Sequence, residues 1–206
     1  MSPRVAVLDH GSGNLRSAVR ALARAGAEVE LTSDVDRAAE AQAVVVPGVG
    51  AYAACMAGLS GIGGVELVRH WVAQQRPLLG ICVGFQVLFE AGTEHGTTTP
   101  GCGVLTGQVT GLAARRLPHM GWNTVSGLAD RYYFVHSYGV AHDPTRPVTS
   151  AATGAQVEVH TTTHQDATFV AAVSSGGLLA TQFHPEKSAE AGSALLRGWV
   201  SRIENR

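Results

Sequence analysis

A cysteine flanked by glycines is the residue of this chain best suited to covalent chemistry. Cys82 is the centre of the segment Gly80–Gly84, which has the form G-x-C-x-G and follows the apolar run 77–81. The pattern matches the nucleophile elbow, a sharp strand-to-helix turn in which glycines two residues either side of the nucleophile prevent collisions of Cβ atoms. A helix over 83–91 would place its positive N-terminal end beside the sulfur and favour the thiolate. The alternative is an ordinary buried cysteine, because free cysteine is often buried.

A second segment could supply the base that a nucleophilic thiol needs. His184 and Glu186 follow the apolar run 178–181, so the imidazole could emerge at the end of a strand. In an extended segment, residues two apart face the same side, and Pro185 between them disfavours a helix. Glu186 could then hold one ring nitrogen of His184 while the other faces the thiol. A surface His-Pro turn is the alternative, which the presence of the cysteine elbow makes weaker.

Acyl transfer also needs hydrogen-bond donors for the oxyanion. The N–H of Val83, directly after the cysteine, is one candidate, and the N–H of Val49 in the loop Pro47–Gly50 is another. That loop could instead be a plain strand-to-helix turn; a phosphate cradle is a weaker alternative because no Walker-type lysine follows. The segment 11–16 begins like a dinucleotide fingerprint but lacks its third glycine, which argues against NAD.

The elements that must position these residues alternate between strand and helix in the first half of the chain. Continuous apolar strands separated by helices indicate a parallel sheet covered on both faces. The second half contains runs that alternate between apolar and polar residues, as strands with one wet face do. The expected strands are 4–9, 29–31, 43–46, 77–81, 104–109, 132–135, 156–162, 168–173 and 178–183, and the expected helices include 51–59, 64–75, 83–91 and 189–203.

Composition limits the class of protein. The 206 residues carry a formal net charge of −1 and form one expected domain, 1–206, with no basic patch for nucleic acid or an anionic membrane. Three widely spaced cysteines without a C-x-x-C motif argue against a zinc site, thioredoxin-like redox chemistry and a disulfide framework. The uncharged stretch 41–65 contains Pro47 and six glycines, so a membrane span is not expected there. We expect a reduced, cytoplasmic protein.

The motifs together resemble those of the class I, or triad, glutamine amidotransferases. That family shares an elbow of the form G-x-C-x-G-x-Q, here Gly80–Gln86, and a later H-P-E, here His184–Glu186. Further blocks resemble the glutaminase subunit of imidazole glycerol phosphate synthase and lie at 9–17, 47–51, 118–123, 133–138 and 182–188. Two positions depart from that pattern, which usually has tyrosine at His10 and methionine at Phe85. The resemblance implies a flavodoxin-like, three-layer α/β fold with a mostly parallel central sheet and additional antiparallel strands in the second half.

The resemblance also implies an activity, the hydrolysis of glutamine to glutamate and ammonia through a thioester. It assigns catalysis to Cys82, His184 and Glu186 and the oxyanion donors to Val49 and Val83. The residues implied to hold glutamine are Gly48, Gly50, Gln86, Glu94, Ser137 and Tyr138. No cofactor or metal is implied.

The implied partner is the cyclase subunit of the same synthase, a (β/α)₈ barrel that receives the ammonia in a heterodimer. The residues implied to face it are Asn14, Arg16, Met120, Trp122, Asn123 and Lys187. Three alternatives remain at this point: the subunit of another triad amidotransferase, a γ-glutamyl hydrolase-like cysteine hydrolase, and a non-catalytic binding subunit on the same fold.

Overall fold

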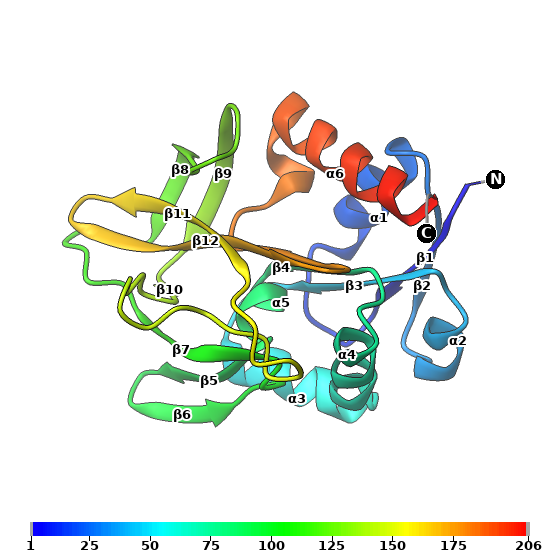
Figure 1. The fold of residues 1–206 in the computed structure, drawn as a ribbon, viewed down its shortest axis with the longest axis horizontal. Coiled ribbons are helices and arrows are strands. Elements are labelled where there is room, and N and C mark those ends of the chain that lie inside the picture. Colours follow the sequence, from blue (N-terminus) through cyan, green and yellow to red (C-terminus); the bar gives the residue numbers. More distant parts are fainter. Residues whose placement is uncertain (1, 205–206) are drawn as a thin grey trace.

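A seven-stranded sheet forms the centre of the molecule (Figure 1). A computed structural model describes residues 2–204, and its strands follow the order β11-β12-β13-β4-β3-β1-β2. Five neighbouring strands, β13 to β2, pair in parallel, and β12 and β11 are added at one edge by antiparallel pairing. The mostly parallel sheet with antiparallel strands from the second half is therefore confirmed. Its strands are β1 (Arg4–Leu8), β2 (Glu28–Thr32), β3 (Ala43–Gly48), β4 (Leu78–Cys82), β11 (Glu158–His164), β12 (Ala167–Ser175) and β13 (Leu178–Thr181).

Helices cover both faces of this sheet, which gives the three layers expected from the sequence. Figure 1 shows α1 (Leu15–Arg24) and α6 (Ala189–Glu204) on one side, and α3 (Tyr52–Gly61) and α4 (Gly64–Ala73) on the other. The short α2 (Val35–Ala39) was not predicted. Every residue of β3 and β4 is buried, because strands made only of apolar residues must be covered on both faces.

Strands between residues 89 and 139 form two smaller sheets. One has the order β10-β7-β5-β6, and the other is the hairpin β8-β9. The predicted strands near 104–109 and 132–135 are confirmed, whereas β5, β6, β8 and β10 were not predicted. These strands are β5 (Phe89–Glu94), β6 (Thr97–Pro100), β7 (Leu105–Gly111), β8 (His119–Thr124), β9 (Arg131–His136) and β10 (Tyr138–Gly139).

The predicted helix over 83–91 is wrong beyond its first turn. Helix α5 spans only Val83–Gln86, and the chain enters strand β5 at Phe89. Tertiary contacts override the local pattern there, because β5 pairs with both β6 and β7 and the ring of Phe89 packs edge-on against Phe85, 5.0 Å away. A single turn carries less helix dipole, so the helix favours a thiolate at Cys82 less than we expected.

The structure also tests the predicted strand 178–183 and the expectation that the stretch 41–65 does not span a membrane. The predicted strand 178–183 ends at Thr181, because Phe183 turns into an aromatic cluster and lies 4.3 Å from the ring of Tyr132. The uncharged stretch 41–65 divides into β3, a loop, α3 and the first residues of α4. Within residues 2–204, no helix combines the length and apolar character needed to cross a membrane.

Candidate active site

The turn that carries Cys82 has the geometry of a nucleophile elbow. Cys82 ends β4 with φ 55° and ψ −111°, a backbone conformation that residues other than glycine rarely adopt. A Cβ atom on Gly84 would lie 1.8 Å from the carbonyl oxygen of Val46, and one on Gly80 would lie 2.9 Å from that of Gly84. The prediction that both glycines prevent collisions is confirmed. The sulfur is thus presented at the carboxyl end of a central strand.

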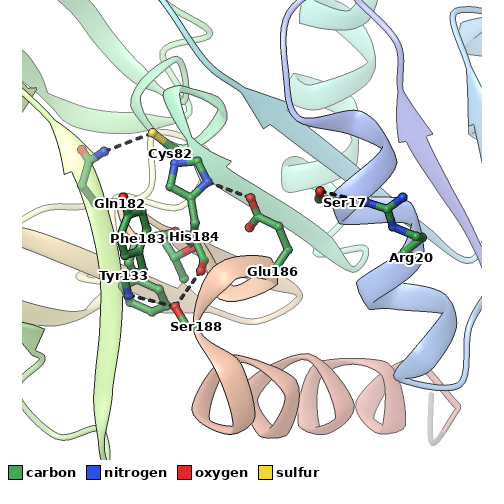
Figure 2. Close-up of polar contacts among 10 residues, drawn as sticks. Ser17, Arg20, Cys82, Tyr133, Gln182, Phe183, His184, Glu186 and Ser188 are labelled. Atoms are coloured by element: carbon green, nitrogen blue, oxygen red, sulfur yellow. Dashed lines mark hydrogen bonds and ion pairs between the residues drawn. The ribbon is translucent and has the colours of Figure 1, made fainter. Parts of the chain in front are cut away.

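His184 reaches the same edge of the sheet because β13 is the parallel neighbour of β4. Its Nδ1 lies 2.8 Å from Oε1 of Glu186, and the two side chains are only 2% and 3% exposed. The other ring nitrogen faces the sulfur of Cys82 (Figure 2), and the interaction between these two groups raises the pKa of His184. The extended form expected for this segment is found only at His184, since Pro185–Lys187 forms a 3-10 turn. Proline is tolerated at the start of such a turn because it needs no N–H there.

The surroundings of His184 favour its protonated form. Burial alone lowers the pKa of the imidazole, but hydrogen bonds to Cys82 and Glu186 and the charges of these groups outweigh burial. Together they raise the pKa from 6.5 to about 9. The contribution of this histidine to the free energy of unfolding is therefore complete below pH 6.5 and is lost as the pH rises through about 9.

The backbone at His184 is fixed to strand β9 by a buried serine that the sequence analysis missed. Ser188 Oγ donates to the carbonyl oxygen of His184 at 2.6 Å and accepts from the N–H of Tyr133 at 2.9 Å (Figure 2). The N–H of His184 donates to the carbonyl oxygen of Tyr133 at 2.9 Å. Membership of the block 182–188 was the only sequence signal for Ser188.

A pocket of about 330 Å³ lies over Cys82 and His184, within the size range of small-molecule sites. Most residues that the sequence implied for glutamine and the oxyanion line it. Gly48 does not: it lies beneath the elbow, where a Cβ atom would meet the N of Gly84 at 2.5 Å. The lining residues are Val49, Gly50, Cys82, Val83, Gln86, Glu94, Val135, His136, Ser137, Tyr138, His184 and Lys187.

Two glutamine side chains connect the sulfur to the wall of the pocket. Gln182 Nε2 points toward the sulfur of Cys82 at 3.8 Å (Figure 2), a contact the sequence analysis did not anticipate. Gln86 Nε2 donates to Oε1 of Gln182 at 2.9 Å and to the carbonyl oxygen of Tyr138 at 2.8 Å. Gln86 therefore holds the backbone of Tyr138 and the side chain of Gln182 in place on the wall of the pocket.

The loop with the second oxyanion candidate is engaged by a serine. Ser12 Oγ donates to the carbonyl oxygen of Val49 at 2.5 Å, and the N–H of Val49 donates to Ser12 Oγ at 3.4 Å. On the opposite wall, Oε2 of Glu94 accepts from the N–H of Tyr52 at the start of α3, 2.9 Å away. The carboxylate is thus held at a helix N-terminus, where negative charge is stabilised.

The residues implied to face a partner are divided between the surface and the pocket. Met120 and Trp122, both on β8, are 66% and 49% exposed. Asn14 and Arg16 are exposed at the start of α1. Asn123 is half-buried and donates to the carbonyl oxygen of Thr163 at 3.0 Å, and Lys187 lines the pocket.

A thiol beside a histidine that is itself held by a carboxylate has the chemical equipment for nucleophilic acyl transfer. The comparisons with known proteins agree in class: the model of the family "Glutamine amidotransferase class-I" matches residues 6–201. A crystal structure of a glutamine amidotransferase superimposes with a TM-score of 0.70 at 25% identity, covering 97% of this chain and 98% of that one.

Two curated relatives narrow the assignment. The imidazole glycerol phosphate synthase subunit HisH of Cutibacterium acnes is 51% identical over 97% of this chain and 97% of its own length. The HisH subunit of Corynebacterium efficiens is 51% identical over 98% of this chain and its full length. The chain therefore belongs to the class I glutamine amidotransferases and, among them, to the HisH subunits of imidazole glycerol phosphate synthase.

Proposed function

We propose that this chain is the glutaminase subunit of an imidazole glycerol phosphate synthase. It hydrolyses glutamine and passes the ammonia to a cyclase subunit, which forms imidazole glycerol phosphate for histidine biosynthesis. The observation that carries the proposal is 51% identity along nearly the whole chain to HisH subunits, together with a buried His184–Glu186 pair beside the sulfur of Cys82. We propose that the chain works as one cytoplasmic domain and needs no cofactor.

The first half of the reaction forms a thioester on Cys82. His184, whose raised pKa of about 9 keeps it protonated at neutral pH, stands beside the sulfur of Cys82, and the sulfur attacks the carboxamide carbon of glutamine. The N–H groups of Val83 and Val49 stabilise the negative oxygen of the tetrahedral intermediate. His184 donates its proton to the nitrogen, the C–N bond breaks, and ammonia leaves the γ-glutamyl thioester.

The second half hydrolyses the thioester. Water attacks the thioester carbon while His184 accepts the proton of the water. The C–S bond then breaks, glutamate leaves, and the free sulfur of Cys82 again stands beside the protonated His184. Glu186 keeps the imidazole in one orientation through both halves and stabilises its positive charge.

The residues around the pocket suit the two ends of free glutamine. The carboxylate of Glu94 attracts the α-ammonium group, and the backbone at Gly50, Ser137 and Tyr138 offers hydrogen bonds at short range. Gln86 orients this wall through the carbonyl oxygen of Tyr138, and Gly48 supports the elbow from beneath.

The partner surface includes residues from β8, from the start of α1 and from the rim of the pocket. Exposed Met120 and Trp122 are typical of interface cores, in which methionine and tryptophan are enriched. The full proposed set is Asn14, Arg16, Met120, Trp122, Asn123 and Lys187.

Glutamine hydrolysis by the isolated chain should be slow. The N–H of Val49 is bonded to Ser12 Oγ, so one oxyanion donor is engaged before substrate arrives. A partner that shifts this loop would release the donor and raise kcat, because only one donor, that of Val83, is otherwise at hand.

The assay that tests the function measures glutamate formed from glutamine by the intact chain, alone and with purified cyclase and its nucleotide substrate. We expect slow release alone and an increase of about 100-fold or more with the partner, the magnitude typical of one oxyanion donor. Cleavage of γ-glutamyl peptides in preference to free glutamine would contradict the proposal and favour a γ-glutamyl hydrolase.

The pH dependence of the activated enzyme should reveal His184. Because the protonated imidazole delivers the proton to the leaving ammonia, and its pKa is raised to about 9, we expect kcat to fall above about pH 9. Glu186→Gln removes a charge that raises this pKa, so the alkaline fall should move to lower pH and kcat should drop by ~100-fold or more. An unchanged alkaline limb in Glu186→Gln would contradict the assigned role of Glu186.

A further inference from the structure

Two buried histidines face each other across the hairpin of β8 and β9. His119 and His136 are directly paired in register, and they are only 4% and 7% exposed. His119 Nδ1 lies 3.2 Å from His136 Nε2. The rings of Phe134 and Phe169 pack around both. The acyl-transfer chemistry proposed above uses neither imidazole, although buried polar side chains are costly.

Only one arrangement of protons satisfies both imidazoles. His136 Nδ1 lies 2.8 Å from the carbonyl oxygen of Tyr138, which can only accept, so Nδ1 carries the proton. Burial, partly opposed by this bond, lowers the pKa of His136 to about 3, so the ring is neutral and its Nε2 accepts from His119. Burial and the nearby His164 lower the pKa of His119 to about 4, so its Nε2 is also an acceptor. Nδ2 of Asn123 lies 3.4 Å from that atom.

The inner end of this chain of hydrogen bonds reaches the sulfur. The carbonyl oxygen of Tyr138 also accepts from Gln86 Nε2 at 2.8 Å, and Gln86 donates to Gln182 Oε1 at 2.9 Å. Gln182 Nε2 in turn points at the sulfur of Cys82, 3.8 Å away (Figure 2). His136 also lines the pocket itself.

The outer end lies on the strand that we propose as part of the partner surface. Asn123 belongs to β8, whose Met120 and Trp122 are 66% and 49% exposed. We propose that His119 and His136 are positioning residues that couple strand β8, when a partner binds it, to the Tyr138 carbonyl and the Gln86–Gln182 pair beside Cys82. This inference rests on the proposed function, because it assigns one physical route to activation by the cyclase.

The variant His119→Phe interrupts this series of hydrogen bonds in its middle. A phenyl ring suits the aromatic surroundings, since His119 already packs 4.8 Å from Phe134, but it offers no nitrogen to His136 or Asn123. The readout is the ratio of kcat for glutamine with cyclase and nucleotide to kcat of the full chain alone. We expect this ratio to fall by about 2- to 30-fold, the range of couplings carried by such networks.

His164→Phe is the matched control. His164 stacks on His119 with ring centroids 4.3 Å apart. Its Nε2 donates to the carbonyl oxygen of Arg116 at 2.9 Å and takes no part in the series of hydrogen bonds from Asn123 to Cys82. Its activation ratio should remain within about twofold of the original. Equal losses in both variants would show that aromatic packing alone matters, and would overturn the inference.

A double-mutant cycle separates coupling from two independent defects. Asn123→Ala should lower the activation ratio of the otherwise unsubstituted protein, but it should change the ratio little further in the His119→Phe variant. Additive losses would overturn the inference.

If His119→Phe fails to fold, ¹⁵N NMR of the unsubstituted protein decides. His136 must carry its proton on Nδ1, and a proton on Nε2 would overturn the inferred series of hydrogen bonds. Absence of glutamine hydrolysis in the original chain would contradict the proposed function instead, so the two failures are distinguishable.

Discussion

Replacing Cys82 with alanine should reduce glutamine hydrolysis by about 10⁴-fold or more, with or without the cyclase. The reason is that no other group in the pocket can form the thioester, and a water molecule would have to attack the carboxamide directly. Alanine keeps the Cβ atom at this position, where φ is 55°, and loses only the sulfur, so the substitution should leave the fold intact. The measurement is glutamate release by the full chain, with circular dichroism to establish that the variant is folded.

Cys55→Ala and Cys102→Ala are the matched controls. Both thiols are buried, and burial is the main cause that raises the pKa of each to about 12, so they remain protonated and unreactive at neutral pH. These variants should lose some stability but keep the activity of the folded protein. Retention of full ammonia release by Cys82→Ala, or its loss in a folded Cys55→Ala, would contradict the proposed mechanism.

Gly84→Ala should destabilise the protein by more than about 3 kcal/mol or prevent folding, beyond the usual cost of overpacking. The added Cβ would lie 1.8 Å from the carbonyl oxygen of Val46, and this neighbour is backbone of the central strand β3, which has no room to move. Either the elbow opens, which displaces Cys82, or the β3–β4 pairing is lost. Urea unfolding of the two proteins measures the difference.

Gly198→Ala controls for the substitution itself. Gly198 lies within α6, is exposed and has open space around its Cα. Alanine there should raise the free energy of unfolding by ~0.5–1 kcal/mol, because glycine is a poor helix former. A Gly84→Ala protein as stable as the original would mean that the turn at Cys82 does not require the close approach of Gly84 to the backbone of Val46.

The features that the sequence predicted well are local. The elbow glycines and the apolar strand before Cys82 follow from residues within a few positions of one another, and so does the His184–Glu186 contact. The central sheet followed from continuous apolar runs such as that of β3, which need cover on both faces. These patterns can be recognised without knowledge of distant contacts, because local backbone geometry and the burial of apolar residues determine them.

The features that the sequence did not predict depend on distant contacts. The residues after Gln86 have a helical pattern, but pairing with β6 and β7 makes the segment from Phe89 a strand. Ser188 and Gln182 acquire their roles only when β9 and β4 lie beside them. The same holds for His119 and His136, whose spacing of 17 residues gives no signal until the β8–β9 hairpin pairs them.

The central claim is that Cys82 is activated by His184 to attack the carboxamide of glutamine. The most direct measurement is the mass of the intact chain, followed by peptide mapping, after exposure to an electrophilic glutamine analogue with and without excess glutamine. We predict one adduct, on Cys82, that glutamine suppresses, and none in His184→Asn on the same timescale. An adduct on Cys55 or Cys102, or labelling of Cys82 that neither glutamine nor the loss of His184 affects, would contradict this account.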